Sequence, residues 1–296
     1  MTESTWTVAE PHALTFEEPV TALSVRIVQG AVNVVGVHEG PARLEVSDLD
    51  GPPLIVTQRN GTLTVAYEDL PWQGFLNWLE GKSKGARRSA TVSLAVPAGT
   101  RVEVGVVGAG AVVSGIDGST EVRAVTGDLT LVGLTGTVRA DTVSGNLEAQ
   151  SLTGQLRFHS VSGDLTVIDG TARVRAESVS GDMLLDLGPD PADRPADISL
   201  TSVSGELAVR LAPDADAHVE ASTASGRIAN DFDDLKVTGQ WGAKRLAGSL
   251  GTGTGRLRAG TLSGSVALLR RPAAAEDPFT TPPAPNAPAT DFKKVL

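Results

Sequence analysis

Hydrophobic and polar residues alternate with a period of two along much of this chain. Leu129 and Leu131 flank a polar residue, as do Leu165 and Val167. Alternation over short runs indicates half-buried β-strands. Adding 18 to any of these positions reaches another apolar residue. The pattern therefore predicts one continuous core built from equal layers.

A five-residue phrase marks the same point in each layer. It reads Val-Thr-Gly-Asp-Leu at 125–129, Val-Ser-Gly-Asn-Leu at 143–147, Val-Ser-Gly-Asp-Leu at 161–165, Val-Ser-Gly-Asp-Met at 179–183 and Val-Ser-Gly-Glu-Leu at 203–207. The first three intervals are 18 residues each, and weaker copies such as Leu134-Thr135-Gly136 lie nine residues away. This spacing predicts an all-β fold, a single-stranded β-solenoid with rungs of about 18 residues, each made of two strand-plus-turn halves.

The phrase also has the composition of a turn. Glycine is expected there because it accepts a positive φ, and the preceding Ser or Thr is expected to hydrogen-bond the local backbone. Beyond Val203 the spacing loosens. The Gly- and Pro-rich segment 188–195 predicts a loop that projects from one rung. Copies of the phrase at 224–228 and 262–266 indicate further rungs along the chain.

The two ends of the chain lack the phrase. Residues 1–100 are rich in β-formers and are expected to form the first, degenerate rungs, which cap an exposed end. Asn60-Gly61 indicates either a two-residue hairpin or a solenoid corner. We place an N-terminal lead-in at 1–19, the solenoid at 20–271 and a disordered Pro/Ala-rich tail at 272–296.

Composition narrows the classes of function. The chain has no cysteine, which excludes disulfides and cysteine metal sites. It has no apolar run of the ~18 residues that span a bilayer, and its N-terminus lacks the basic flank and apolar core of a signal peptide. We therefore expect a cytoplasmic protein. The net charge of −10 argues against a nucleic-acid partner.

Segment 71–88 interrupts the strands and is the most distinctive non-repetitive element. Aromatic and basic side chains gather in it, and these are candidates for contact with a partner or a membrane: Trp72, Phe75, Trp78, Lys82, Lys84, Arg87 and Arg88. Its apolar residues fall at the spacing of one face of a short helix. Such a helix could cap the apolar end of the solenoid, or it could dock on a protein or a membrane surface.

Two columns of charged residues are predicted along the solenoid. A turn column follows the glycine of each phrase and contains Asp128, Asn146, Asp164, Asp182 and Glu206. It could bind cations, but the residues suit turns in which a side-chain oxygen accepts backbone hydrogen bonds. An opposite surface ladder contains Arg139, Arg157 and Arg175. It could bind an anionic polymer or a partner, or form a solvated face paired with nearby acids.

Catalysis has little support in the sequence. The four histidines, His12, His38, His159 and His218, are scattered and lack metal-ligand spacing. The run 251–255 has no lysine of a phosphate loop, and no Gly-x-Ser-x-Gly elbow is present. We assign no catalytic residue, metal or cofactor and do not expect an enzyme.

The phrases at 161–165 and 179–183, their 18-residue spacing, and the ending Thr261-Leu262-Ser263-Gly264-Ser265-Val266 before Arg270-Arg271 resemble a bacterial β-strand-repeat family. This is the putative adhesin or toastrack family, largely of unknown function, and the resemblance covers roughly residues 20–271. It implies a single-stranded, right-handed β-solenoid and supplies no catalytic residues. Members often accompany cell-envelope stress systems and carry membrane segments. This chain is similar to a free-standing, actinobacterial-type member without such a span.

From these observations we expect a non-catalytic scaffold or interaction protein that binds protein partners or assembles with itself. Solenoid ends and flat faces favour such association. A peripheral membrane or cell-envelope stress module is the alternative, with segment 71–88 at the lipid. A carbohydrate-active β-helix enzyme is a third interpretation.

Overall fold

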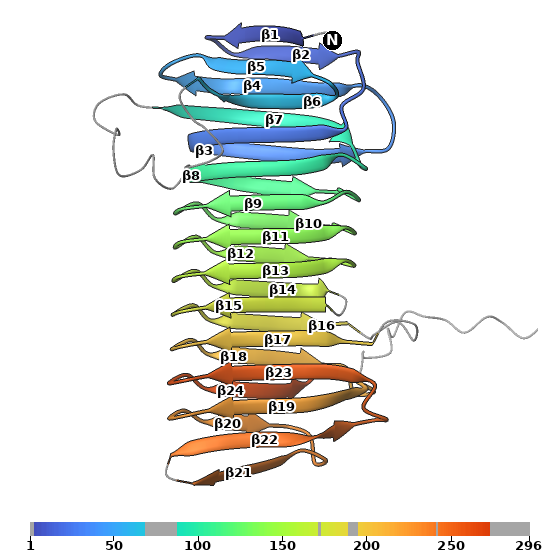
Figure 1. Cartoon of the computed structure of the whole chain (residues 1–296), viewed down its shortest axis with the longest axis vertical. Coiled ribbons are helices and arrows are strands. Elements are labelled where there is room, and N and C mark those ends of the chain that lie inside the picture. The colour runs from blue at the N-terminus through green and yellow to red at the C-terminus, as the bar shows by residue number, and fades with distance from the viewer. Residues whose placement is uncertain (1–2, 69–87, 171–172, 189–194, 241, 273–296) are drawn as a thin grey trace, which may run out of the picture.

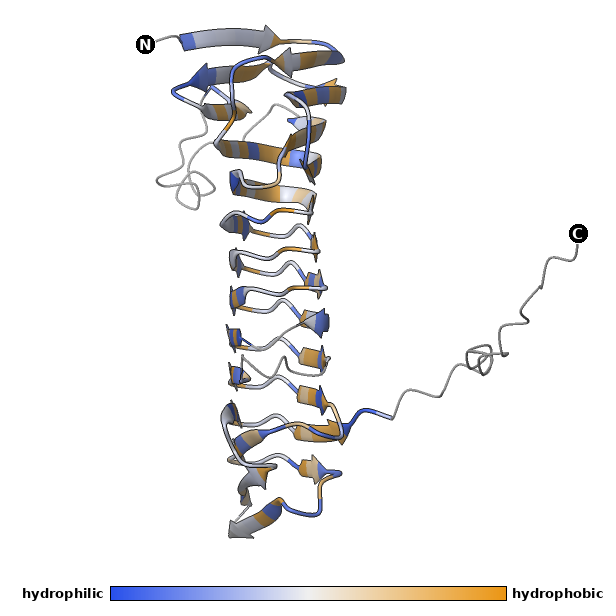
Figure 2. Ribbon diagram, turned by 90° about the vertical axis from the view of Figure 1, so that its right-hand side faces the viewer, coloured by the Kyte–Doolittle hydropathy of each residue, from blue (hydrophilic) through white to orange (hydrophobic). Residues whose placement is uncertain are grey.

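The computed structural model describes residues 3–68, 88–170, 173–188, 195–240 and 242–272, and every regular element within them is a β-strand. The strands stack into one tall, flattened solenoid, with β1 and β2 at one end and β21 at the other (Figure 1). Turned by a quarter, the stack shows two columns of strands joined by turns (Figure 2). The all-β solenoid predicted from the repeat is confirmed.

The two columns are two faces, here named face A and face B. In spatial order, face A contains β1 (Glu3–Val8), β5 (Leu54–Arg59), β6 (Thr62–Tyr67), the first part of β3 (Ala22–Val37), the first part of β8 (Arg101–Ser114), β9 (Thr120–Ala124), β11 (Thr137–Thr142), β13 (Gln155–Ser160), β15 (Arg173–Ser178), β17 (Asp197–Ser202), β23 (Gly255–Thr261), β19 (Ala217–Thr223), β22 (Ala243–Leu250) and β21 (Lys236–Gln240).

Face B is built in the same way from the other half of each rung. It contains β2 (His12–Phe16), β4 (Ala42–Asp50), β7 (Ser89–Pro97), the second parts of β3 and β8, β10 (Leu129–Val132), β12 (Leu147–Gln150), β14 (Leu165–Gly170), β16 (Met183–Leu187), β18 (Leu207–Leu211), β24 (Val266–Arg270) and β20 (Ile228–Asn230).

Parallel pairing in the middle of the stack follows the 18-residue period. Leu129 pairs with Leu147, and Leu147 pairs with Leu165. On face A, Arg139 pairs with Arg157. Because side chains alternate along a strand, equal registers place every second residue inside. Leu129, Leu147 and Leu165 are all buried, so the predicted apolar columns form the core between the two faces.

The glycine of the phrase is required for close stacking and not for a positive φ. None of the phrase glycines adopts a positive φ. A Cβ built on Gly163 would lie 2.0 Å from the carbonyl oxygen of Gly145, and one on Gly181 would lie 2.0 Å from that of Gly163. The sequence interpretation of this glycine was wrong: the turn of each rung rests directly on the backbone of the one before.

The serine of the phrase connects neighbouring rungs. The Ser162 backbone N–H and hydroxyl both donate to the carbonyl of Val143, at 2.9 and 3.3 Å. The expected local hydrogen bond is made two residues earlier, by Ser160, whose buried hydroxyl accepts from the Gly163 N–H at 2.7 Å. Buried hydroxyls occupy the same position in other rungs: Thr142, Ser178, Ser202, Thr223 and Thr261.

The N-terminal end departs from the repeat. β1, β2, β4 and β5 pair antiparallel with their neighbours, so they are not the degenerate rungs that we expected. The Asn60-Gly61 alternative resolves to a hairpin between β5 and β6, with φ of 50° and 76°. The expected lead-in, 1–19, supplies the outermost strands β1 and β2, where Trp6 packs edge-on against Phe16 at 5.4 Å.

The C-terminal end changes the order of the rungs. The rung of β23 and β24 lies between the rung of β17 and β18 and the rung of β19 and β20. The antiparallel strands β22 and β21 then follow β19 on face A. The copies at 224–228 and 262–266 are therefore rungs, as expected, but they stack in the reverse of their order along the chain.

Several predicted segments lie outside the described residues. These are most of the 71–88 insert, residues 189–194 of the 188–195 loop and residues 273–296 of the tail. Within the described part of the chain, no helix is long and apolar enough to cross a membrane.

Candidate functional site

A line of exposed aliphatic side chains follows the corner where each rung turns from face A to face B. We name this line the corner ridge, and its members are Val143, Val161, Val179, Val203 and Leu262, with 37% to 58% of each side chain exposed. The backbone N–H of Leu262 donates to the carbonyl of Val203, so the ridge continues through the inserted rung. Apolar side chains lined up in this way on a soluble protein are a candidate contact surface.

The ridge faces outward because of strand parity. Val138, Ala140 and Thr142 point into the core along β11, so Val143 must follow on the outside. Sequence analysis identified the phrase but not the exposure of its first residue. Counting inward positions across the turn would have found it, because β11 ends on the inward-facing Thr142 and the turn then begins on the outer side.

The predicted turn column lies beside the ridge, and its side chains are exposed. The Oδ1 atoms of Asp128, Asn146 and Asp164 accept the backbone N–H of the equivalent residue in the next rung, at 3.1, 3.0 and 2.8 Å. Asp182 accepts from Glu206 in the same way at 2.7 Å. These oxygens are structural acceptors between rungs. Among the described residues, no group of three or more His, Asp or Glu side chains is placed to hold a metal ion.

The predicted arginine ladder lies on the outer surface of face A. Arg139, Arg157 and Arg175 are stacked neighbours in register on β11, β13 and β15. Arg139 pairs with Asp141 at 2.8 Å and Arg175 with Glu177 at 3.1 Å, each two residues along its own strand. Among the described residues, Arg157 has no ion-pair partner, so an exposed guanidinium lies between two others.

The aromatic and basic insert contributes one described residue. Arg88 lies 5.8 Å from the centre of the Tyr67 ring, and its carbonyl accepts the Gln29 N–H at 3.0 Å. Burial raises the pKa of Tyr67 to about 12, although the Arg88 charge opposes this shift. Trp72, Phe75, Trp78, Lys82, Lys84 and Arg87 lie outside the described residues, so the roles assigned to them stay predictions.

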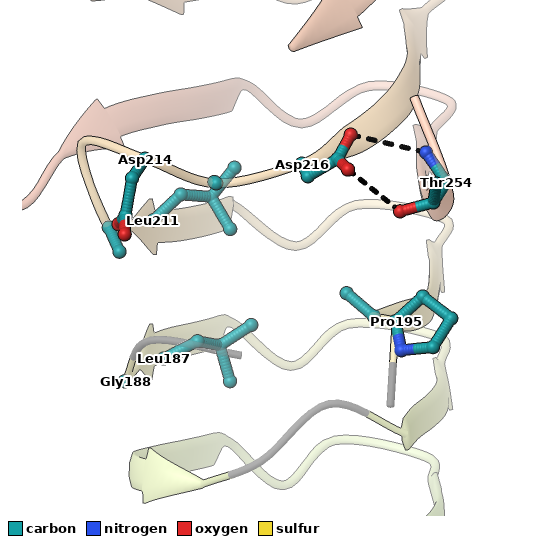
Figure 3. Close-up of a pocket in the computed structure, with 10 residues that line it drawn as sticks. Leu187, Gly188, Pro195, Leu211, Asp214, Asp216 and Thr254 are labelled. Atoms are coloured by element: carbon teal, nitrogen blue, oxygen red, sulfur yellow. Dashed lines mark hydrogen bonds between the residues drawn. The ribbon is translucent and has the colours of Figure 1, made fainter. Parts of the chain in front are cut away.

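A pocket of about 340 Å³ opens at the other corner, beside Leu187, Pro195, Leu211 and Thr254 (Figure 3). Asp216 is its best-defined polar group. The carboxylate accepts the hydroxyls of Thr252 and Thr254, at 2.6 and 2.8 Å, and the backbone N–H groups of Gly253 and Thr254. These bonds, led by the one from Thr252, lower the pKa of Asp216 to about 2.

This pocket is poorly suited to acid–base chemistry. A general acid needs a pKa near the working pH, and Asp216 is held ionised far below it. Its two oxygens are both engaged in fixing the turn 251–254. Among the described lining residues, Asp214 is the other ionisable group. We therefore regard the pocket as a by-product of a structural turn.

Arg271 connects several rungs at the corner where the chain turns from face B back to face A. It pairs with Asp169 at 2.8 Å, and its Nε lies 3.6 Å from Asp186. Arg210 also pairs with Asp186, at 3.0 Å. This network ties the residue that follows β24 to β14 and β16, which lie far earlier in the chain, and its role is structural.

Comparison with known proteins identifies a family for this chain but assigns it no activity. A search of curated proteins finds no match to the chain. Two solved structures are similar over most of it. One, described as a putative cell adhesion protein from Clostridium sporogenes, has 10% identity and a TM-score of 0.26, covering 88% of this chain and 100% of that one. The other, described as a putative lipid binding protein from Parabacteroides distasonis, has 12% identity and a TM-score of 0.48, covering 89% and 98%.

The family profile gives the stronger result. The Toastrack DUF4097 profile matches residues 42–269, which contain β4 to β23 and all but the last residue of β24. The match covers well over half of the chain and agrees with the resemblance read from the phrases. The protein therefore belongs to the Toastrack DUF4097 family.

Proposed function

We propose that this protein is a non-catalytic scaffold that binds protein partners, or copies of itself, along its solenoid surface. The observation that carries the proposal is the corner ridge. Five of the exposed large aliphatic side chains among the described residues fall in this one column. Exposed apolar residues scattered singly are normal, whereas a contiguous apolar surface is typical of an interaction site.

The ridge has the properties of a rigid contact surface. Its residues stand on turns fixed by rung-to-rung hydrogen bonds, such as those from Ser162 and Ser180 to the carbonyls of Val143 and Val161. Little conformational freedom is therefore lost on binding. Covering a half-exposed valine contributes roughly 1 kcal/mol at about 25 cal/mol per Å². Five such side chains in one column would together contribute roughly 5 kcal/mol to a contact.

The ridge can be tested with a nearly isosteric change. In the variant V161T/V179T/V203T the side chains keep their shape and β-propensity but become polar. The matched control, V35T/V112T/V237T, changes three valines of similar exposure away from the corner. Tagged proteins are used to capture partners from cells of the source organism, and light scattering reports self-association.

We expect the ridge variant to lose partners, or self-association, that the wild type and the control both retain. Circular dichroism and thermal unfolding check that all three proteins are equally folded. If every interaction survives in the ridge variant, the ridge is not the contact surface and the proposal fails.

A further inference from the structure

Two charged columns of opposite sign run along this solenoid with the same repeat distance. One is the turn column, Asp128, Asn146, Asp164, Asp182 and Glu206, and the other is the arginine ladder, Arg139, Arg157 and Arg175. Successive members lie on hydrogen-bonded neighbouring strands or turns, so each column advances by about 4.8 Å per rung.

Among the described residues, no ion pair joins the two columns within one molecule. The arginines project from the outer surface of face A, in the middle of β11, β13 and β15, whereas the acids stand past the corner where face B begins. The arginine ion pairs that the structure describes here go to Asp141 and Glu177, on the arginines' own strands. Such exposed pairs contribute little to stability.

The turn column keeps binding capacity after its structural role is met. Asp164 and Asp182 each use Oδ1 to accept a backbone N–H from the next rung. The second oxygen of each carboxylate takes no hydrogen bond among the described residues. Guanidinium groups pair well with such free carboxylate oxygens.

We infer that the partner of this solenoid is a second copy of the same chain, packed side by side so that the turn column of one copy lies against the arginine ladder of the other. This inference rests on the proposed function and names its partner. An identical copy has an identical rung spacing, so a contact made at one rung is repeated at the next. A partner with another spacing would match at one rung only.

The corner ridge strengthens the same contact. It lies three residues before the turn column, as Val161 does before Asp164, so both columns meet the partner together. The aliphatic stems of Arg139, Arg157 and Arg175 can cover the valines while their guanidinium groups reach the carboxylates. A nucleic acid or another long polyanion is disfavoured because it could pair with the arginine ladder alone, whereas a second copy also brings arginines to the acidic turn column.

The test uses sedimentation velocity of the full chain at ~50 mM and ~500 mM salt, since surface charge pairs are screened at high salt. One variant, D128N/D164N/D182N, removes the acidic charge but keeps the acceptor oxygen, as the natural Asn146 does. The other, R139Q/R157Q/R175Q, removes the ladder charge. The matched controls, E10Q/E39Q/E45Q and R43Q/R59Q/R270Q, make the same charge changes at exposed sites outside both columns.

We expect the wild type and both controls to associate at low salt and to dissociate at high salt. The turn-column variant and the ladder variant should each weaken association by about tenfold or more. The variant that combines both changes should be no weaker than either alone, because residues in contact have non-additive effects.

Additive losses would mean that the columns bind different things and would overturn the inference. A wild type that stays monomeric at low salt would overturn it too. If that monomer still captures another protein through the corner ridge, the inference fails while the proposed function stands.

Discussion

Each rung of this solenoid depends on a glycine that has almost no room around it. Gly163 lies so close to the preceding turn that an added methyl group would overlap the Gly145 carbonyl. We expect G163A to destabilise the protein by about 1–3 kcal/mol or more, the usual cost of overpacking. Urea unfolding followed by circular dichroism measures the change.

Gly99 provides the control for this substitution. A Cβ built there meets nothing within 4 Å, and its φ is not positive. We expect G99A to leave the free energy of unfolding within about 0.5 kcal/mol or to raise it slightly, because alanine restricts the unfolded chain. Equal losses in the two variants would contradict the close-stacking explanation.

Two serines in the same turn should differ in importance. Replacing Ser160 by alanine leaves the Gly163 N–H buried without its acceptor, which costs about 1–3 kcal/mol. Replacing Ser162 by alanine removes a donor to the Val143 carbonyl, but that oxygen still accepts the Ser162 backbone N–H. S162A should therefore cost clearly less than S160A in the same unfolding experiment, and the reverse order would refute this assignment.

At the scale of one element, Asp216 fixes the turn that precedes β23. Its folded pKa of about 2 lies below the unfolded value of 3.8, so its hydrogen bonds stabilise the protein above about pH 4. This contribution is lost as the pH falls from about 4 toward 2. We expect D216N to melt below the wild type at neutral pH, with the difference in Tm shrinking over that window.

The donors supply the control for this pH dependence. In a T252V/T254V background the two hydroxyl bonds that lower the pKa most are absent. The effect of D216N on Tm should then depend much less on pH. A pH dependence that is unchanged in this background would show that the hydroxyls do not set the pKa of Asp216.

The sequence was informative wherever one rung rests on a copy of itself. The 18-residue spacing predicts the register of β10, β12 and β14, because equal rungs can align in one way that keeps the leucines inside. It does not predict the order of the last rungs. Thr223-Ala224-Ser225-Gly226 and Thr261-Leu262-Ser263-Gly264 carry equivalent turns, so either could stack on Ser202-Val203-Ser204-Gly205.

The order of the last rungs depends on the segments that connect them and on the strands that cover the C-terminal end of the stack. Phe232 and Leu235, in the segment after β20, are buried, and β22 and β21 extend the end of face A. The antiparallel strands at the N-terminal end likewise depend on long-range pairing without a repeat. For the candidate site, the 18-residue period was enough to predict the positions of the turn column and the arginine ladder. The exposure of the corner ridge could be predicted only by following the inward and outward alternation of side chains from β11 through the turn.

At the scale of the whole molecule, the regular stack should tolerate the loss of a complete rung. Deleting residues 147–164 removes β12 and β13 and joins Asn146 to Leu165, which occupies the same position one rung later. Every inward column and every phrase contact is then restored between β10 and β14 and between β11 and β15. Because solenoid stability is a sum over rungs and their interfaces, this protein should fold with a lower stability.

The matched control deletes half a rung, residues 147–155. It joins Asn146 to Leu156 and sends the β13 sequence to face B, so that each later strand must pair with the wrong column. We expect the 18-residue deletion to give a folded protein whose long dimension, measured by small-angle X-ray scattering, is shorter by about 4.8 Å. The nine-residue deletion should be unfolded or aggregated. Equal tolerance of both deletions would mean that the two faces are interchangeable, which the distinct outer surfaces of β13 and β12 argue against.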